Sequence, residues 1–537
     1  MSDTDDSDGP SHNLLAELHT SLHACSVETV DDRLFLCGLY ELNEEEQVRN
    51  GKLVVCDTLA TLQRIEEQQE QQELGVTNDT SRSSRSPLSS SSTPAIVTCG
   101  SVQTDGGVLD CKVTNYVAAA ALSTGRLDLY DIRADPDNGS SGSGSGSANG
   151  DSDHSGCDID VGVVHLGGVS SPDSGLFLSL DWSCGASGYH PHSSGGAGAE
   201  CNYRQNHIAV STQASEILIY DASVFDSAGS GSGTTAPIHT ITNAHNLYGE
   251  NVPVWIVAYD PLSGGRRLAT GGDDCALRLW DVRIPAAAAC TGVGVVSGGT
   301  SGGSTQGVPG PGVGTNVFNG PTDNDGDDGV DGSSAECSST CTATNKKSHT
   351  AGVTSAQWHP HTEHLLVTGS YDGVARLWDA RMLTRCLWEA DVEGGIWRAK
   401  WWWAGGLRSA TPDASSSSSS SSPGSSSNSN SSNSSASTSS HLALACMHGG
   451  CNVFNVPHAS EGQGQGLLGA SPFRVGKHYR ESLPEQTQGH LAYGLALLQA
   501  PAHSGSGSSK GSSSGKWLAA SCSFYDDIVQ LWSVPAS

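Results

Sequence analysis

The feature that most constrains the fold of this chain is a short strand pattern that recurs seven times along its 537 residues. Each copy alternates apolar with variable residues and ends on an apolar or aromatic residue followed by Asp, Asn or Ser. The copies lie at 52–57, 126–131, 216–221, 276–281, 374–379, 450–455 and 528–533. A period of two is that of a half-buried strand, so the chain repeats one strand-based unit.

Two of the copies carry a fuller pattern. Gly271-Gly-Asp-Asp274 comes before Trp280, and Gly369-Ser-Tyr-Asp372 comes before Trp378. A glycine, a turn aspartate and then a Trp-Asp pair is the signature of WD-repeat propeller blades. The sequence therefore predicts an all-β fold, a seven-bladed WD-repeat β-propeller.

Low-complexity inserts explain why the copies lie 60 to 98 residues apart, when such repeats usually span about 40–45 residues. The inserts lie near 64–94, 134–158, 185–200, 226–236, 285–345, 404–440 and 502–515. We expect them to be disordered, because they are too polar to bury a core. Residues 1–13 form an acidic tail that we also expect to be disordered. The rest, about 47 residues per copy, predicts one propeller domain over 14–537.

The ring also has to close. The last copy ends at Ser533, four residues before the end of the chain, so the seventh blade has no outer strand of its own. The segment 14–22, just before the first inner strand near 25–30, is the expected donor. Closure of this kind removes exposed sheet edges.

Composition excludes several classes of function. The chain has 57 acidic and 27 basic residues, a net charge of −30, so we expect no direct contact with nucleic acid. No run of 18 apolar residues and no signal-peptide core are present, so we expect no membrane association. The cysteines lie singly in predicted strands, which indicates reduced thiols. We expect a cytoplasmic monomer that needs no cofactor.

Apparent catalytic and metal motifs are interpreted as accidental. Three Gly-x-Ser-x-Gly matches lie in Ser/Gly repeats, at 299–303, 507–511 and 511–515, and none joins a strand to a helix. Two groups have metal-like spacing: Cys337, Cys341 and His349, and His359, His361 and His364. The first spans an expected disordered loop and the second a predicted turn, so we predict no metal site.

Several motifs go beyond the general blade pattern. They are Leu178–Trp182, Gly271–Asp274, Gly369–Asp372, Gly394–Trp401, Ala445–Gly449 and Cys522–Asp526. In this order they resemble the diphthine methylesterase family, WD-repeat enzymes of diphthamide biosynthesis. The resemblance implies hydrolysis of the methyl ester of methylated diphthine, which is carried by translation elongation factor 2 as the protein substrate. The product would then be ready for the final amidation.

The positions of the inserts indicate which face of the ring binds the substrate. With blade strands named a to d from the centre outward, the inserts fall in a–b and c–d connections, which share one face. The opposite face carries d–a and b–c connections, which are mainly short. We expect this second face to admit a large protein substrate.

Two blades contain a residue set that we interpret as a buried structural network. In a regular blade the turn aspartate binds a histidine, which reaches a serine of strand b and the tryptophan of strand c. His349, Ser370, Asp372 and Trp378 fit this set, and His245, Asp274 and Trp280 fit it with Gly272 in place of serine.

Blade six departs from this pattern. His448 holds the aspartate position and Cys446 the serine position, two residues apart, so both side chains should leave the same side of one strand. His448 is a candidate general base for attack by water, and Cys446 is an alternative nucleophile. The structural alternative is a repacked network with Cys446 as a small buried residue.

The implied substrate carries a quaternary ammonium, which binds best against aromatic faces with a carboxylate nearby. The expected working face offers an acidic residue, Asp273, and five aromatic residues: Trp255, Tyr371, Trp397, Tyr493 and Tyr525. Arg398 is a candidate to bind the ester carbonyl or the developing oxyanion. Two alternatives to the hydrolase remain: a non-catalytic WD-repeat scaffold, and a reader of methylated ammonium groups that needs no base.

Overall fold

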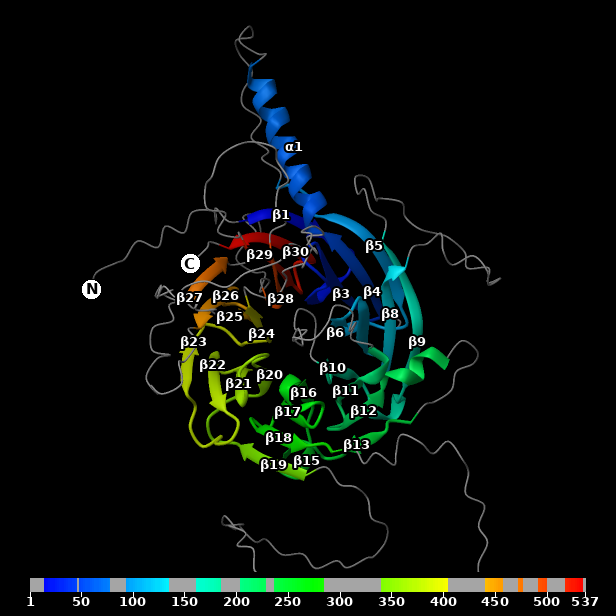
Figure 1. The fold of residues 1–537 in the computed structure, drawn as a ribbon, viewed down its shortest axis with the longest axis vertical. Coiled ribbons are helices and arrows are strands. Elements are labelled where there is room, and N and C mark those ends of the chain that lie inside the picture. Colours follow the sequence, from blue (N-terminus) through cyan, green and yellow to red (C-terminus); the bar gives the residue numbers. More distant parts are fainter. Residues whose placement is uncertain are drawn as a thin grey trace, which may run out of the picture. The chain divides into compact units, whose positions relative to one another are not determined.

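The chain is described from a computed structural model. It covers residues 14–45, 48–77, 93–134, 161–184, 203–227, 236–283, 340–403, 440–456, 472–476, 491–499 and 517–534. Within these ranges the strands form seven four-stranded sheets and one two-stranded hairpin. The sheets are blades around a common centre (Figure 1), and each inner strand packs against the inner strands of the two neighbouring blades. The fold is therefore the predicted seven-bladed β-propeller.

The strands of the first four blades follow one another outward from the centre. Blade 1 contains β2 (His23–Thr29), β3 (Leu34–Asn43), β4 (Val48–Asp57) and β5 (Val97–Thr104). Blade 2 contains β6 (Val108–Thr114), β7 (Val117–Leu122), β8 (Arg126–Ala134) and β9 (Gly162–Ser170). Blade 3 contains β10 (Phe177–Trp182), β11 (His207–Thr212), β12 (Ile217–Asp221) and β13 (His239–Ile241). Blade 4 contains β16 (Val254–Tyr259), β17 (Arg267–Gly272), β18 (Leu277–Asp281) and β19 (Thr340–Asn345).

The remaining elements complete the ring. Blade 5 contains β20 (Val353–Trp358), β21 (Leu365–Ser370), β22 (Val374–Asp379) and β23 (Trp388–Asp391). Blade 6 contains β24 (Arg398–Trp403), β25 (Ser440–Ala445), β26 (Cys451–Val456) and β27 (Pro472–Gly476). Blade 7 contains β28 (Ala492–Gln499), β29 (Trp517–Ser523), β30 (Ile528–Val534) and β1 (Leu14–His19). The hairpin is β14 (Asn246–Leu247) with β15 (Glu250–Asn251); the helices are α1 (Thr58–Thr77), η2 (Pro172–Ser174), η3 (Tyr203–Gln205), η4 (Ala222–Ser227) and η5 (Pro261–Ser263).

The ring closes as predicted. Strand β1 pairs antiparallel with β30, so the N-terminal segment supplies the outer strand of blade 7. The side chain of Gln530 donates a hydrogen bond to Glu17 Oε1 at 2.6 Å. The backbone of Glu17 also bonds Pro94 and Ile96 of blade 1, at 2.9 Å each. Strand β1 therefore covers the edge of β30 and ties the last blade to the first.

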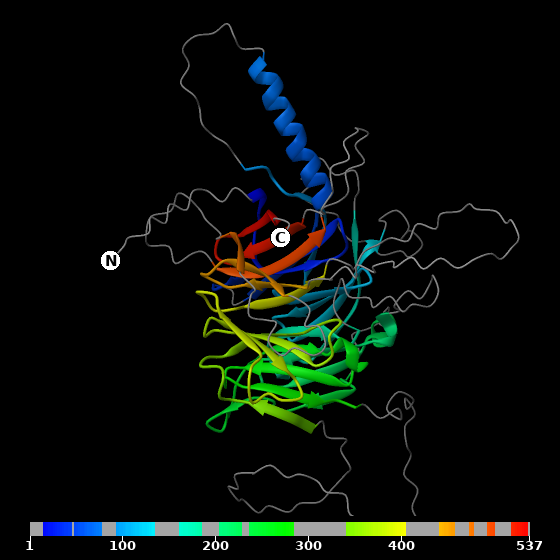
Figure 2. The same cartoon turned by 60° about the vertical axis from the view of Figure 1, so that its left-hand side comes forward.

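The expectation of disorder over 64–94 is wrong for its first part, because α1 continues to Thr77. Buried Asp57 caps the helix by accepting the Ala60 N–H at 3.1 Å, and Leu62 and Ile65 pack against the core of blades 7 and 1. The glutamates and glutamines that follow are good helix formers, although their composition resembles a disordered segment. Figures 1 and 2 show the helix leaving the rim beside β1 and β5.

The insert near 285–345 also ends earlier than expected, because β19 begins at Thr340 and forms the outer strand of blade 4. The other inserts fall mostly outside the described residues. All of the inserts lie in a–b or c–d connections, as predicted, while six of the seven d–a connections are described throughout. The seventh, 477–490 between β27 and β28, lies outside the described ranges. We call the face of the d–a and b–c connections the upper face.

No helix in the described ranges combines the length and apolar character that crossing a bilayer requires. No disulfide joins the cysteines that the structure describes.

Candidate functional site

Inner strands aim large side chains at the upper face through β-bulges. The register of β16 shifts between Val254 and Ile256, and that of β28 shifts between Ala492 and Gly494. The extra residues at these shifts are Trp255 and Tyr493. A bulge inserts one unpaired residue and re-aims its side chain, so both aromatic rings sit at the start of an inner strand beside the upper-face turns.

These rings belong to a continuous row that we call the aromatic arc: Trp255, Tyr371, Trp397, Tyr493, Phe524 and Tyr525. Neighbouring ring centroids are 4.8 Å apart for Trp397 and Tyr493, and 5.2 Å for Tyr493 and Phe524. The Trp255 ring lies 5.7 Å from Trp397 and 6.4 Å from Tyr371. The arc thus spans blades 4 to 7 and joins all five aromatic residues predicted from the sequence.

One end of the arc carries a carboxylate. Trp255 Nε1 donates a hydrogen bond to Asp273 Oδ1 at 2.6 Å. Burial, and then the charge of Asp273, raises the pKa of Tyr371 to about 12, so its hydroxyl stays protonated at neutral pH. Gly352 packs so closely here that a Cβ on it would lie 2.7 Å from Asp273 Oδ1 and 3.3 Å from the Tyr371 ring. The predicted pairing of aromatic rings with Asp273 is present.

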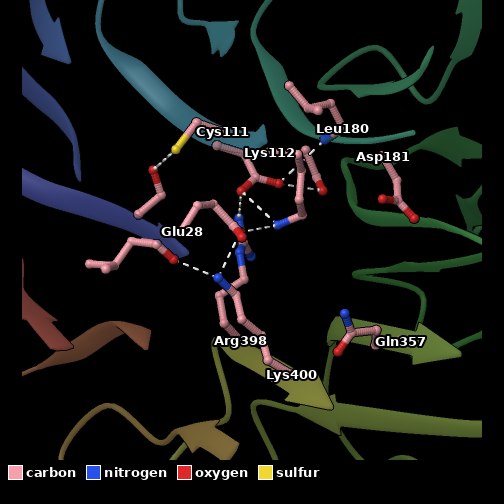
Figure 3. Close-up of polar contacts among 12 residues, drawn as sticks. Glu28, Cys111, Lys112, Leu180, Asp181, Gln357, Arg398 and Lys400 are labelled. Carbon is pink, nitrogen blue, oxygen red and sulfur yellow. Dashed lines mark hydrogen bonds and ion pairs between the residues drawn. The ribbon is translucent and has the colours of Figure 1, made fainter. Parts of the chain in front are cut away.

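Beneath the arc, charged side chains from non-neighbouring blades meet at the centre of the ring (Figure 3). This central cluster consists of Glu28, Asp110, Lys112, Arg398 and Lys400. Glu28 Oε1 accepts hydrogen bonds from Lys112 Nζ at 2.8 Å and Lys400 Nζ at 2.6 Å. Blades 1, 2 and 6 are thereby connected across the ring.

The charges in the cluster control each other's protonation. Burial alone would raise the pKa of Asp110, but Lys112, Arg398, Ser179 and Lys400 together hold it below its usual value. Burial lowers the pKa of Lys400, against the opposing pull of Glu28. Nearby Asp181 has its pKa raised to about 7 by burial, although two backbone N–H groups and Lys112 oppose this. The cluster brings three basic side chains together with two acidic ones, and Asp181 is a third acidic side chain nearby.

Arg398 links the central cluster to the arc. Its Nη1 donates to the Trp397 carbonyl at 3.0 Å, and its guanidinium carbon lies 5.3 Å from the centre of the Trp397 ring. The Nη2 atom is 3.6 Å from Asp110 Oδ1, and neither Nε nor Nη2 donates a hydrogen bond to any residue within the described chain. At 4% exposure the guanidinium lies behind Trp397, where it fixes that ring and contributes charge from below.

Blade six does not have the geometry predicted for Cys446 and His448. Strand β25 ends at Ala445, and the chain then turns through Met447, whose φ is +44°. Cys446 is 0% exposed and accepts from Asn452 Nδ2 at 3.3 Å, while His448 is exposed. The two side chains therefore do not leave one side of a strand. His448 makes no hydrogen bond, ion pair or ring contact with any residue in the described ranges.

The buried network of blade 4 forms, but with a different hydroxyl from the one predicted. That of blade 5 forms only in part, because His349 Nδ1 has no hydrogen-bond partner among the described residues and does not bond Asp372. In blade 4, His245 Nδ1 lies 2.6 Å from Asp274, and Thr270 Oγ1 bonds both His245 Nε2 and Trp280 Nε1. In blade 5, Thr368 Oγ1 bonds His349 Nε2 at 3.0 Å and Trp378 Nε1 at 2.8 Å. The hydroxyl is thus two residues before Gly272 and Ser370. The equivalent residue in blade six is Leu444, so Cys446 does not hold the network's hydroxyl position.

Three residues at the far end of the arc were not predicted from the sequence. Phe524, rather than Tyr525, stacks on Tyr493, because the turn of blade 7 has one more residue than that of blade 5. His23, at the start of β2, packs its ring 4.6 Å from Phe524 and pairs with Asp527. His23 belongs to the first blade, and Phe524 and Asp527 belong to the last. The pattern within a single repeat therefore does not predict that they are in contact.

The described residues contain no group of three or more His, Cys, Asp or Glu side chains placed to hold a metal ion. Of the two groups with metal-like spacing, the first includes Cys337, which lies outside the described ranges. In the second, the rings of His359 and His361 are 6.4 Å apart, and His359 Nε2 lies 3.0 Å from Ser440 Oγ.

A match to a protein-family model agrees with the class of fold. The family described as WD domain, G-beta repeat matches residues 238–281 and 339–379, which form the outer part of blade 3 through blade 5. A solved structure titled "Crystal Structure of Mitotic Checkpoint Complex" aligns over 100% of this chain and 97% of its own, with a TM-score of 0.45 and 11% identity. The chain is a β-propeller that contains WD40 repeats.

Local similarity points to a particular group of such proteins. The chain is 31% identical over 147 residues to the mouse protein named "Diphthine methyltransferase", which covers 27% of this chain and 19% of the mouse protein. It is 53% identical over 55 residues to the human protein of that name, covering 10% and 12% of the two chains. A Dictyostelium discoideum "Diphthine methyltransferase homolog" is 47% identical over 51 residues, covering 9% and 14%. The matches thus span less than a fifth of the length of these relatives.

Proposed function

We propose that this chain acts in diphthamide biosynthesis, where it hydrolyses the methyl ester of methylated diphthine on translation elongation factor 2. The observation that carries the proposal is the composition of the aromatic arc. Four motifs that resemble the diphthine methylesterase family, from four different blades, supply Asp273, Tyr371, Trp397 and Phe524. These motifs meet at the upper face, where the inner strands of the four blades begin. Local similarity to proteins named for diphthine also supports methylated diphthine as the substrate.

The arc is suited to a quaternary ammonium. Such a cation is attracted to aromatic faces, by about 0.5–2 kcal/mol for each favourable ring, and cannot donate a hydrogen bond. Asp273 provides a negative charge beside Trp255 and Tyr371 without needing a proton from the ligand. A methylated diphthine side chain places its ammonium and its ester in one short substituent, so the group that activates water has to lie close to the arc.

The name of these relatives describes a transfer of a methyl group, whereas the proposed reaction removes one. Hydrolysis needs a water molecule, a base and a group that stabilises the oxyanion. The burial of Cys446 favours water over the thiol as the attacking group. Arg398 supports the reaction by holding Trp397 and by placing a positive charge behind it. The assignment of His448 as the base depends on the sequence pattern alone.

A non-catalytic scaffold is the second candidate. It is favoured by Tyr248, which is 97% exposed at the tip of the β14–β15 hairpin in a d–a connection of the upper face. A fully exposed aromatic side chain is typical of a surface that binds another protein. A scaffold with this surface would bind elongation factor 2 without changing its mass.

One experiment separates these functions. Purified chain is incubated with elongation factor 2 that carries methylated diphthine, and the intact mass of the factor is followed. Loss of one methylene unit supports hydrolysis. A gain of one methylene unit from unmethylated factor in the presence of a methyl donor would instead support a transferase. Unchanged mass with stable co-elution would support the scaffold, and the hydrolase proposal would then be abandoned.

A further inference from the structure

A histidine and an aspartate pair across the seam between the first and the last blade. His23 Nδ1 lies 2.6 Å from Asp527 Oδ1, although the two residues are 504 positions apart. His23 begins inner strand β2, and Asp527 lies in the b–c turn between β29 and β30. Both belong to the upper face, and the pair stands at the Phe524 end of the aromatic arc.

The imidazole is held in one orientation. One face packs on Phe524, with centroids 4.6 Å apart, and Tyr525 lies 6.4 Å away. Tyr40, opposite His23 in the β2–β3 register, stacks on the same Phe524 ring at 5.7 Å. The Thr20 N–H bonds the Asp527 carbonyl at 2.8 Å, which fixes the turn that carries the carboxylate. A carboxylate that accepts from Nδ1–H leaves Nε2 as the basic nitrogen.

Comparison with the buried histidines of the same chain shows that this pair is not another structural network. His245 also has an aspartate 2.6 Å from Nδ1, but it is 0% exposed and its Nε2 is satisfied by Thr270. The side chains of His23 and Asp527 are 33% and 43% exposed, and His23 Nε2 has no hydrogen-bond partner in the described chain. Like the structural histidine His245, His23 is oriented by a carboxylate at Nδ1. Unlike His245, it has a second ring nitrogen, Nε2, without a hydrogen-bond partner in the described chain.

We propose that His23 is the general base of ester hydrolysis and that Asp527 positions it. The inference rests on the proposed function and assigns its catalytic residue. The substrate class is a methyl ester of a side chain whose quaternary ammonium rests on the arc near Tyr493, Phe524 and Tyr525. His23 touches the attacking water, whereas Asp527 acts only through His23.

The proposed reaction balances without a cofactor. His23 Nε2 takes a proton from water as the water oxygen bonds the ester carbon, which gives a tetrahedral oxyanion and an imidazolium. Asp527 stabilises that imidazolium through Nδ1–H. The oxyanion then collapses, the bond from carbon to the methoxy oxygen breaks, and Nε2–H returns the proton to the leaving oxygen. The products are methanol and a carboxylic acid, which ionises and releases one proton to solvent.

The carboxylate should also set the pH dependence of the base. The titratable groups that face His23 are Asp527, Tyr525 and Tyr40; the neighbouring Asp526 is bonded to the Ser523 hydroxyl. Asp527 is the group among these that contacts the imidazole directly, 2.6 Å from Nδ1. Its removal disfavours the imidazolium and moves the acidic limb of the rate profile to lower pH.

The test uses the full chain and methyl-diphthine elongation factor 2, with kcat and KM measured over a range of pH. His23→Gln should lower kcat by at least about a hundredfold, since a general base typically contributes about 10²–10⁴-fold. Its acidic limb should disappear, KM should change little, and added imidazole should restore part of the activity of His23→Ala. Asp527→Asn should lower kcat less and shift the limb to lower pH. Thermal unfolding checks that each variant is folded.

His165→Gln is the matched control, because His165 is also partly exposed and lies 3.6 Å from an aspartate, Asp128, but on an outer strand. It should keep wild-type kinetics. Folded His23→Gln with wild-type kcat and an unchanged limb would overturn the inference, as would loss of activity in His448→Ala alone. Wild-type chain without any ester hydrolysis would instead overturn the proposed function, so the two failures are distinguishable.

Discussion

Arg398 Nη2 lies 3.6 Å from Asp110 Oδ1, although the two residues come from blades 6 and 2, which are not neighbours in the ring. Both side chains are almost fully buried, and Lys112 lies 3.4 Å from the same oxygen. The contact spans the centre of the propeller rather than a blade interface. The central cluster therefore contributes to the rigidity of the ring as well as to the charge beneath the aromatic arc.

Asp110→Asn should destabilise the fold strongly. The substitution leaves two buried cations with less negative charge near them, and breaking a buried ion pair in this way typically loses about 3–5 kcal/mol. Urea unfolding followed by tryptophan fluorescence at neutral pH measures the change. Asp131→Asn is the control, because the Asp131 pair with Arg133 at 3.8 Å is largely exposed and should contribute less than about 1 kcal/mol. Equal effects of the two variants would contradict the role of the cluster.

Tyr371→Ala should raise KM by roughly 3- to 30-fold and leave kcat nearly unchanged, because an aromatic face that holds an ammonium contributes about 0.5–2 kcal/mol in ground and transition states alike. Tyr371→Phe keeps the ring and should bind the substrate almost normally. Asp273→Asn should raise KM in the same direction, since it removes the carboxylate beside Trp255. A fall in kcat at unchanged KM would contradict this prediction and would show that the arc contributes to the chemical step rather than to substrate binding.

The stability of the fold should fall as the pH is lowered from about 6.5 toward 4. Burial, and then the charge of Arg376, lowers the pKa of His349 to about 4. The unfolded state therefore binds more protons than the folded state within this window. The stability that depends on neutral His349 is complete above about pH 6.5 and is lost as the pH falls toward 4. The loss from His349 is at most about 3 kcal/mol.

Urea midpoints measured between pH 4 and 7 check this dependence. His349→Gln should flatten it, whereas His19→Gln, at an exposed position, should leave it as in the wild type. An unaltered slope in His349→Gln would show that other groups, such as His245, whose pKa burial also lowers, dominate the acid response.

Deletion of residues 1–20 should destabilise the whole ring, because it removes β1 and exposes the edge of β30. Deletion of residues 1–13 removes no described strand and should leave the unfolding midpoint nearly unchanged. Thermal unfolding and light scattering compare the two truncated chains. Equal stability of both would mean that blade 7 does not need its N-terminal strand.

The blade count and the closure could be predicted because both depend on local strand patterns that repeat. The hydroxyl of each buried network could not, because Thr368 and Ser370 leave the same side of β21 and period two does not distinguish them. Ser370 Oγ donates instead to the Ala351 carbonyl at 3.1 Å. The helix that follows Asp57 was missed because glutamine and glutamate are common in both helices and disordered segments.

The candidate site was predicted only in part, for a physical reason. Trp255, Tyr371 and Trp397 could be found because each occupies a recognisable position within its own blade. Phe524 was missed because the blade-7 turn has one extra residue, so Phe524 rather than the expected Tyr525 contacts Tyr493. The contact between His23 and Asp527 depends on how the first and last blades meet. No periodicity within a repeat encodes a contact between the first blade and the last.

The seam also fixes when the protein becomes functional during its synthesis. Asp527 is made 504 residues after His23, which at about 5–20 residues per second is a delay of roughly 25–100 s. Until then the nascent chain holds six blades at most, and neither β1 nor His23 has its final neighbour. We expect the proposed dyad to form in the same event that closes the ring. A chain with only six blades carries Trp255, Tyr371 and Trp397, but it lacks the blade-7 part of the aromatic arc and the partner of His23.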